Sequence, residues 1–320
     1  MKKIVPVVVL GLALMSGCSR DTETIKRDLN QITICGSESE KPLAVLLTDE
    51  YHKQKPEITF DVKGGGSDAG IKALLDRKTD VALSSRLISD VEMGNAATLD
   101  VNVHQVIVAV EAVAIITHPS VGVEFITVAD LAAVYDGRIR NWKELGGPDM
   151  EIYPVGRKHG SGTRSYMLHR LSIEEFCPQT IEFETYEDIL STVKTNRGAI
   201  AYISSRFISY AEGRLDPAIW VMNVSLNGMP FISPVDREAI EYGDYALMRP
   251  LFQYYSDDAS KQLMDFIDFQ LSDVGQKLVV KFGYHPINDY HREINKRNSI
   301  DSVSSTKKVT ENWTGRHSLI

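Results

Sequence analysis

The sequence predicts an α/β protein of two domains, on three observations. Segments with strand and helix periodicity alternate with short connections, which is typical of parallel sheets covered by helices. The chain has 320 residues, a length that favours about two domains. The β-prone run 104–117 is long enough to pass from one domain to the other, because a strand rises about 3.3 Å per residue.

Composition and charge are those of an ordinary globular protein. Hydrophobic residues make up 43% of the chain and charged residues 24%, and 35 basic residues against 43 acidic ones give a net charge of -8. These values exclude a collagen-like chain, a coiled coil and a mainly disordered chain. They also lack the basic excess of a nucleic-acid binder, so no nucleic-acid partner is expected. The eight histidines show no metal-ligand spacing, and no metal or other cofactor is expected.

The N-terminus has the pattern of a bacterial lipoprotein signal. Two lysines precede the apolar run 4–15, which is too short to span a membrane, and Ser16-Gly17-Cys18 follows. Small residues before a cysteine resemble the lipobox, in which that cysteine is acylated. We therefore expect 1–17 to be a signal peptide, Cys18 to be lipidated and 18–30 to be a polar tether. The alternative is an ordinary secretory signal with an incidental cysteine.

Either signal places the protein outside the cytoplasm, on the periplasmic side of a bacterial membrane. Ser19 after a lipidated Cys18 resembles Gram-negative lipoproteins and favours the outer membrane if the source is Gram-negative. Disulfides are permitted there. Cys35 follows Ile32-Thr33-Ile34 and is interpreted as a buried small hydrophobe, while a bridge between Cys35 and Cys177 stays open.

The first domain begins with alternating strands and helices. Strands are expected at 31–35, 58–62 and 80–83, and helices at 42–53 and 68–77. In the helix 42–53, Leu43, Leu46, Leu47 and Tyr51 share one face, as an amphipathic helix requires. The crossing run 104–117 then leads into the second domain.

The second domain continues the same alternation. Helices are expected at 128–134, 161–171 and 188–194, and strands at 152–155 and 199–203. The run 245–255 returns the chain to the first domain, where 261–271 forms an amphipathic helix. Two crossings make the first lobe discontinuous, with 31–112 and 246–290 on one side and 113–245 on the other. Residues 291–320 lack periodicity and are interpreted as a flexible or loosely docked tail.

Three loops share one design, in which a strand leads through glycine and serine into a helix. They are 36–39, 64–67 and 160–163. Glycine lets the backbone approach a ligand closely, hydroxyls donate hydrogen bonds, and a helix N-terminus offers free N–H groups with a positive dipole end. Plain helix capping explains any one such loop, but three that converge would bind an oxyanion.

A few other residues are candidates for the same chemistry. Arg157 precedes the third loop and suits bidentate pairing with an anion. Asp80 is interpreted either as a turn or cap residue or as a ligand acceptor, and Arg86 as a partner of local carboxylates. Ser161 lacks the context of a catalytic serine. Trp142 and Tyr202 are expected in the core.

Together these segments resemble a known family. The motifs ITICGSESEKP, KGGGSDAGIKALL, DVALSSR, IRNWKELGG, VGRKHGSGTRSYM, NRGAIAYIS, MRPLFQYY and GQKLVVKFGYHPI occur in this order over about 31–288. They are similar to the phosphate-binding proteins of bacterial ABC importers, the PstS family. The resemblance implies a two-lobed type II periplasmic-binding-protein fold with parallel-type sheets and helices on both faces. It implies a monomeric, non-enzymatic protein that captures inorganic phosphate for an ABC permease.

The resemblance also implies roles for individual residues. Ser39 would donate its hydroxyl and Glu40 its backbone N–H, and Ser67 would donate from the second loop. Arg157 would pair with the anion as the sole side-chain cation, Asp80 would be the acceptor carboxylate, and the helix-terminal cradle would comprise Ser161, Gly162 and Thr163. Glu38 departs from the family pattern, because its carboxylate near an anion would oppose binding.

Alternatives remain at this stage. The ligand is phosphate on the leading interpretation, and another oxyanion such as sulfate or molybdate on the next. A phosphate sensor or surface protein would use the same fold without transport, and a phosphatase would use the site for hydrolysis.

Overall fold

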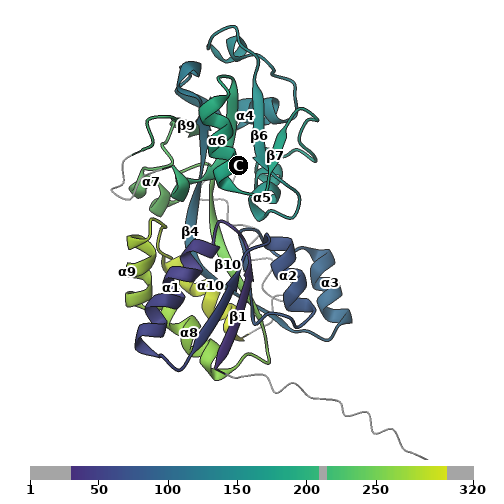
Figure 1. Ribbon diagram of the computed structural model, residues 1–320, viewed down its shortest axis with the longest axis vertical. Helices are drawn as coiled ribbons and strands as arrows, with labels where there is room; N and C mark the ends of the chain where they lie inside the picture. The colour runs from purple at the N-terminus through teal and green to yellow at the C-terminus, as the bar shows by residue number, and fades with distance from the viewer. Residues whose placement is uncertain (1–29, 209–214, 301–320) are drawn as a thin grey trace, which may run out of the picture.

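The computed structural model describes residues 30–208 and 215–300 as two lobes joined by extended strands (Figure 1). The expected signal peptide, Cys18 and the tether lie outside the described residues. No helix among the described residues is both long enough and apolar enough to cross a bilayer. The α/β class expected from the sequence is confirmed.

Lobe 1 is built on the strands at one end of a continuous sheet. Their order is β2-β1-β3-β10-β4, in which β1, β2 and β3 run parallel and β10 runs antiparallel to both of its neighbours. The strands are β1 (Gln31–Gly36), β2 (Thr59–Lys63), β3 (Val81–Ser84), β4 (Val103–Thr117) and β10 (Met248–Ser256).

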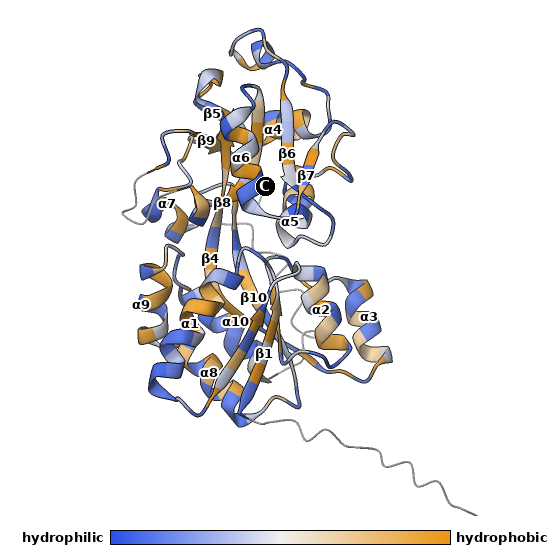
Figure 2. Ribbon diagram, viewed as in Figure 1, coloured by the Kyte–Doolittle hydropathy of each residue, from blue (hydrophilic) through white to orange (hydrophobic). Residues whose placement is uncertain are grey.

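Helices cover both faces of the lobe 1 strands. The apolar sides of α1 (Lys41–Gln54), α8 (Lys261–Leu271) and α9 (Asp273–Lys281) form one buried cluster. Those of α2 (Ser67–Leu75), α3 (Asp90–Thr98) and α10 (Asp289–Ile300) form another. Strand residues alternate between the two clusters, since neighbouring side chains in a strand point to opposite faces. The orange, apolar sides of these helices face the strands in Figure 2.

Lobe 2 continues the sheet as β4-β8-β6-β7, and β9 bridges β4 and β5. Its strands are β5 (Phe125–Thr127), β6 (Tyr153–Arg157), β7 (Ile181–Phe183), β8 (Ala199–Ser204) and β9 (Trp220–Ser225). Its helices are α4 (Val128–Tyr135), α5 (Gly162–Leu171), α6 (Tyr186–Thr195) and α7 (Arg237–Tyr242), with 3-10 turns η1 (Pro119–Val121), η2 (Trp142–Leu145) and η3 (Ser205–Phe207). Trp142 and Tyr202 are fully buried, so the expectation that both belong to the core is confirmed.

Two strands carry the chain between the lobes. The first part of β4 pairs with β10, and from Val113 onward β4 pairs with β8 instead. Because β4 and β10 lie side by side and antiparallel, both crossings form one ribbon (Figure 1). This ribbon places Glu111 of β4 opposite Arg249 of β10, at the junction of the lobes.

The interpretation of 291–320 as a loose tail is wrong for its first ten residues. Helix α10 includes them, and His291 and Ile294 are buried. Asn295 fixes the helix to β4, since its side chain accepts a hydrogen bond from the Ile107 N–H at 2.8 Å and donates one to the Ile107 carbonyl at 2.8 Å. Lobe 1 therefore extends to residue 300, and 301–320 lie outside the described residues.

Candidate functional site

The three glycine- and serine-rich loops meet where the lobes face each other. The loops after β1 and β2 come from lobe 1, and the loop after β6 comes from lobe 2. The backbone N–H of Asp68, in the first turn of α2, donates to the carbonyl of Gly160 across the junction at 3.3 Å. A side chain on Gly66 would lie 2.5 Å from that same carbonyl, and Gly66 also has a positive φ of 92°. Only glycine allows this approach.

Four buried serine hydroxyls form a cluster on the lobe 1 side. The Ser37 hydroxyl lies 3.1 Å from that of Ser39 and 3.1 Å from that of Ser85, and the Ser67 hydroxyl accepts from the Ser85 N–H at 3.2 Å. All four residues are at most 2% exposed. Ser39 and Ser67 were predicted as ligands, Ser85 only as the next candidate after Asp80, and Ser37 not at all. The serine pair at the end of DVALSS was the signal for Ser85.

Gly162 of lobe 2 is pressed against this cluster. A Cβ atom on Gly162 would lie 2.2 Å from the Ser67 hydroxyl oxygen and 2.5 Å from that of Ser85. Gly162, the first residue of α5, thus lies against the hydroxyls of lobe 1 with its backbone, since it has no side chain. Its neighbour Ser161 caps the helix, with its hydroxyl accepting from the Arg164 N–H at 3.5 Å.

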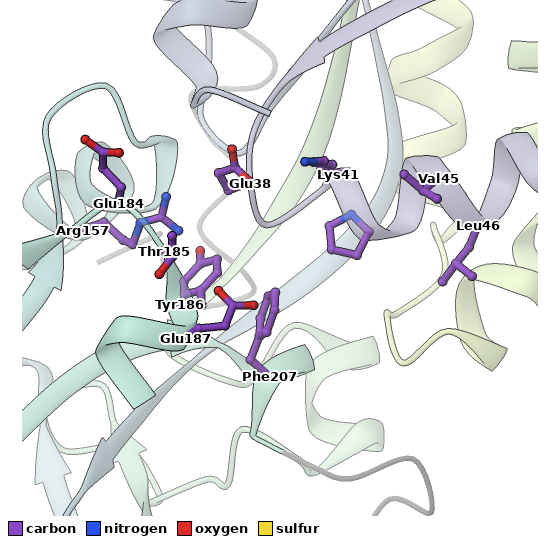
Figure 3. A pocket seen from close by; sticks show the side chains of 11 residues that line it. Glu38, Lys41, Val45, Leu46, Arg157, Glu184, Thr185, Tyr186, Glu187 and Phe207 are labelled. Atoms are coloured by element: carbon purple, nitrogen blue, oxygen red, sulfur yellow. The ribbon is translucent and has the colours of Figure 1, made fainter. Parts of the chain in front are cut away.

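Arg157 is the buried cation at the mouth of this junction. It ends β6, is 3% exposed, and packs its guanidinium 4.4 Å from the ring centre of Tyr186. Within the described residues, its Nε and Nη1 atoms are buried and have no hydrogen-bond partner. Figure 3 shows Arg157 beside Tyr186, in a cleft of about 530 Å³ that Glu38 also lines. Because a buried charge without a partner is costly, an anion bound here would be stabilised.

Thr163 links the two sides of the site. Its hydroxyl lies 2.7 Å from that of Tyr186 and accepts from Arg249 Nη2 at 2.9 Å. The structure therefore brings together Ser39, Ser67, Arg157, Ser161, Gly162 and Thr163, as the sequence predicted.

The side chains of the two acidic residues of the first loop accept hydrogen bonds from the protein itself. The carboxylate of Glu38 accepts from the Gly65 N–H at 2.7 Å and so lies against the neighbouring loop. Glu40 directly precedes α1, so its backbone lies at the start of that helix. Its side chain is buried and accepts a hydrogen bond from Gln253 at 3.2 Å. Burial raises the pKa of the Glu40 carboxyl well above its ordinary range.

The prediction that Asp80 is the acceptor carboxylate is wrong. Asp80 immediately precedes β3, and its carboxylate accepts from both the N–H and the hydroxyl of Thr33 at 2.7 Å. The loops of the site follow the opposite, carboxyl ends of β1 and β3. Four residues separate Asp80 from Ser84, or about 13 Å along the strand. Asp80 is the turn residue of the alternative interpretation, and Ser85 takes the place at the site.

The expectation that Arg157 is the sole side-chain cation is also wrong. Arg249 is 2% exposed and pairs with Glu111 at 2.7 Å, and Ser204 donates to the other carboxylate oxygen of Glu111. Burial by itself lowers the pKa of the Arg249 guanidinium. The attraction to the Glu111 carboxylate is stronger than this effect, so the pKa is raised overall. The signal for this pair was Glu111, the lone charged residue inside the apolar run 105–117.

The remaining candidates have structural partners. Arg86 pairs with Asp68 at 2.5 Å and Glu92 at 2.7 Å, as expected. Cys35 and Cys177 are both free thiols, and Cys35 is half-buried rather than buried. No group of three or more potential metal ligands occurs among residues 30–208 and 215–300.

The arrangement has the chemistry of an oxyanion cradle. Helix starts from both lobes, several hydroxyls and one unpaired guanidinium converge between the lobes, and each supplies a hydrogen-bond donor. The hydroxyls can also accept, which suits an anion that still carries a proton.

Comparisons with known proteins agree with this geometry. Residues 21–274 match the family model of the PBP superfamily domain. The phosphate-binding protein PstS of Borreliella burgdorferi is 26% identical over 300 residues, which is 89% of this chain and 98% of that protein. A putative phosphate ABC transporter substrate-binding protein with bound phosphate, from Clostridium perfringens, superposes with a TM-score of 0.71 at 28% identity, over 81% of this chain and 100% of that one. An ABC-type phosphate transport receptor from Vibrio cholerae gives a TM-score of 0.65 at 29% identity, over 80% and 100%.

Proposed function

This chain belongs to the PBP superfamily, and we propose that it captures inorganic phosphate outside the cytoplasm and delivers it to an ABC importer. Similarity to proteins named for phosphate binding extends over most of the chain and, for two solved structures, over their whole length. In this function no bond is made or broken. Binding holds the anion between two lobes that close on it, as in hinge-type binding proteins.

The observation that carries the proposal is the unpaired guanidinium of Arg157. Two of its nitrogens are buried and have no partner among the described residues, and the guanidinium packs on Tyr186, whose hydroxyl lies 2.7 Å from that of Thr163 in the first turn of α5. Glu38, the departure from the family pattern, lines the same cleft as Arg157, and its carboxylate accepts from the Gly65 N–H.

Titration calorimetry of the protein without its signal peptide tests the proposal. We expect a saturable phosphate isotherm, and Arg157→Ala should weaken it by at least about a hundredfold, since loss of a partner from a buried charged pair costs roughly 3–5 kcal/mol. A matched control is Arg138→Ala, an exposed arginine that pairs only with the neighbouring Asp136. A wild-type protein that binds sulfate or molybdate but no phosphate would refute the proposal. Equal affinities of Arg157→Ala and wild type would remove Arg157 from the site.

The site residues and the division into lobes belong to the same proposal. Ser39, the Glu40 N–H, Ser67, Arg157, Ser161, Gly162 and Thr163 would hold the phosphate, and Ser85 replaces Asp80 in this set. Lobe 1 would comprise 31–112 and 246–300, and lobe 2 would comprise 113–245. The protein would act as a monomer.

The lipid anchor is a separate proposal. Cys18 would carry acyl chains that hold the protein at the membrane, because stable attachment needs more than one chain. Metabolic labelling with a fatty-acid analogue tests it: the label should be present in wild type and absent from Cys18→Ser. A wild-type protein that is unlabelled and leaves the membrane fraction would contradict the anchor without touching phosphate binding.

A further inference from the structure

We propose that Arg249 is the positioning residue of this site: it orients the hydroxyl groups of both lobes toward the bound anion and ties the lobes together in the closed form. The inference rests on the proposed phosphate-binding function for its ligand, but the contacts that carry it are independent of that function. Arg249 belongs to the ribbon between the lobes and was assigned no role by the sequence.

Arg249 donates hydrogen bonds to groups of both lobes. Its Nη2 atom lies 3.2 Å from the Ser39 hydroxyl of lobe 1 and 2.9 Å from the Thr163 hydroxyl of lobe 2. Its Nη1 atom donates to the carbonyl of Ser85 at 3.3 Å. One guanidinium therefore contacts the ligand loops of both lobes, and these contacts coexist only when the lobes are closed.

The direction of those hydrogen bonds is fixed. A guanidinium has only donors, so the Ser39 and Thr163 oxygens must accept from it. Each hydroxyl then has its own proton left to donate. Ser39 and Thr163 lie at the cradle, where an oxyanion would accept hydrogen bonds from these hydroxyls. Arg249 thus occupies one lone pair of each hydroxyl and favours the orientation in which the hydroxyl proton points away from the guanidinium, toward the cradle.

The charge of Arg249 is balanced by Glu111. Glu111 faces Arg249 in the strand register and binds it through Nε at 3.1 Å and Nη2 at 2.7 Å. Both side chains are at most 2% exposed. The pair is neutral as a whole, so Arg249 can stay buried when no anion is bound, whereas Arg157 has no such carboxylate partner among the described residues. The two arginines accordingly have different tasks: Arg157 binds charge, and Arg249 orients donors.

The test uses a variant that keeps the buried charge balanced. Glu111→Gln/Arg249→Met removes both charges, which buried pairs often tolerate, whereas loss of one partner would leave the other uncompensated. The control is Arg164→Met. Arg164 is also buried and pairs with two carboxylates, Glu175 and Glu182, but all three residues lie within lobe 2.

We expect the double variant to bind phosphate at least about tenfold more weakly than wild type by calorimetry while it keeps a cooperative thermal transition. Arg164→Met should lower the melting temperature and leave the phosphate affinity within about twofold. Arg249→Lys keeps a donor-only cation beside Glu111 and should recover part of the affinity, which a purely structural role would not predict. A double variant that binds phosphate as tightly as wild type would overturn the proposal. An Arg249→Lys variant that binds phosphate no more tightly than the double variant would also overturn it.

Small-angle scattering separates this proposal from the proposed function. The ligand-free double variant should have a larger average radius of gyration than ligand-free wild type, since loss of the tie between Ser39 and Thr163 shifts the population of molecules further toward the open form. If wild type shows no phosphate isotherm, the proposed function fails, and scattering alone then decides the role of Arg249. Equal radii for wild type and double variant would refute that role whether or not phosphate binds.

Discussion

Replacement of Gly162 by alanine should separate ligand binding from stability. Its Cβ would lie 2.2 Å and 2.5 Å from the hydroxyl oxygens of Ser67 and Ser85, both in the opposite lobe. Those hydroxyls cannot move freely, because Ser67 accepts from the Ser85 N–H and Ser85 lies 3.1 Å from Ser37. The lobes must therefore lie about 1.3 Å farther apart at this point to restore a normal contact distance of roughly 3.5 Å.

Overpacking of this kind costs about 1–3 kcal/mol, which corresponds to a roughly 5- to 150-fold weaker phosphate affinity. Stability should move the other way. Gly162 begins α5 with an ordinary backbone conformation, and alanine favours a helix over glycine by up to about 1 kcal/mol. Because the open form avoids the clash, the thermal midpoint of the ligand-free protein should stay equal or rise.

Gly94→Ala is the matched control. Gly94 also lies in a helix, α3, but a Cβ there meets nothing within 4 Å. It should raise the thermal midpoint and leave the phosphate isotherm unchanged. Calorimetry and thermal melts on wild type and both variants decide the matter. If Gly162→Ala binds phosphate as tightly as wild type, the contact between α5 and the serine cluster is not part of the ligand-bound form.

Three further outcomes follow from the structure. Asp80→Asn should lower the free energy of unfolding by about 1 kcal/mol, because the Asp80 carboxylate binds Thr33. The ratio of the phosphate and sulfate dissociation constants should stay unchanged in calorimetry. A smaller difference between the two constants would return Asp80 to the site. Glu40→Gln should change how stability depends on pH. Because the pKa of Glu40 is raised in the folded state, its contribution to the free energy of unfolding is complete below about pH 4.5, the pKa of the unfolded chain, and is lost as the pH rises. Denaturant titrations at pH 4.5 and pH 9 should therefore show that wild type loses free energy of unfolding relative to Glu40→Gln. Equal changes in the two proteins would contradict burial of this carboxyl. Asn295→Ala should lower the free energy of unfolding by about 1–3 kcal/mol, since it removes both hydrogen bonds to Ile107. Hydrogen exchange of the α10 amides should become faster, while the phosphate affinity stays the same. Unchanged exchange would mean that other contacts hold α10.

Sequence patterns predicted the elements that have a clear apolar period. The helix at 261–271 matches α8 to the residue, and the crossing run 104–117 matches β4 within one residue. Helix α10 was missed for a physical reason. Few of its side chains are apolar, and it is held to β4 by the amide of Asn295, which no hydrophobic period reveals.

The site residues likewise differ in whether the sequence could predict them. The glycine and serine loops could be found from the sequence because each lies in one short segment whose chemistry is local. Asp80 failed because its role came from the family resemblance alone, although the expected strand 80–83 begins at Asp80 and so places it at the end away from the site loops. The Arg249–Glu111 pair could not be found locally, since 138 positions separate the two residues and only the register of β4 with β10 brings them together.

The position of β10 has a consequence for how the chain folds during export. β10 lies between β3 and β4 within the lobe 1 sheet, yet it follows all of lobe 2 in the sequence. The central strand of lobe 1 thus emerges late, and contacts between distant segments form slowly because loop closure must come first. Lobe 2 has nearly all of its strands in one stretch and can fold as a unit. A chain that crosses a membrane from its N-terminus onward would therefore keep its first lobe unfinished, and its phosphate cradle unassembled, until the last third of the sequence has arrived.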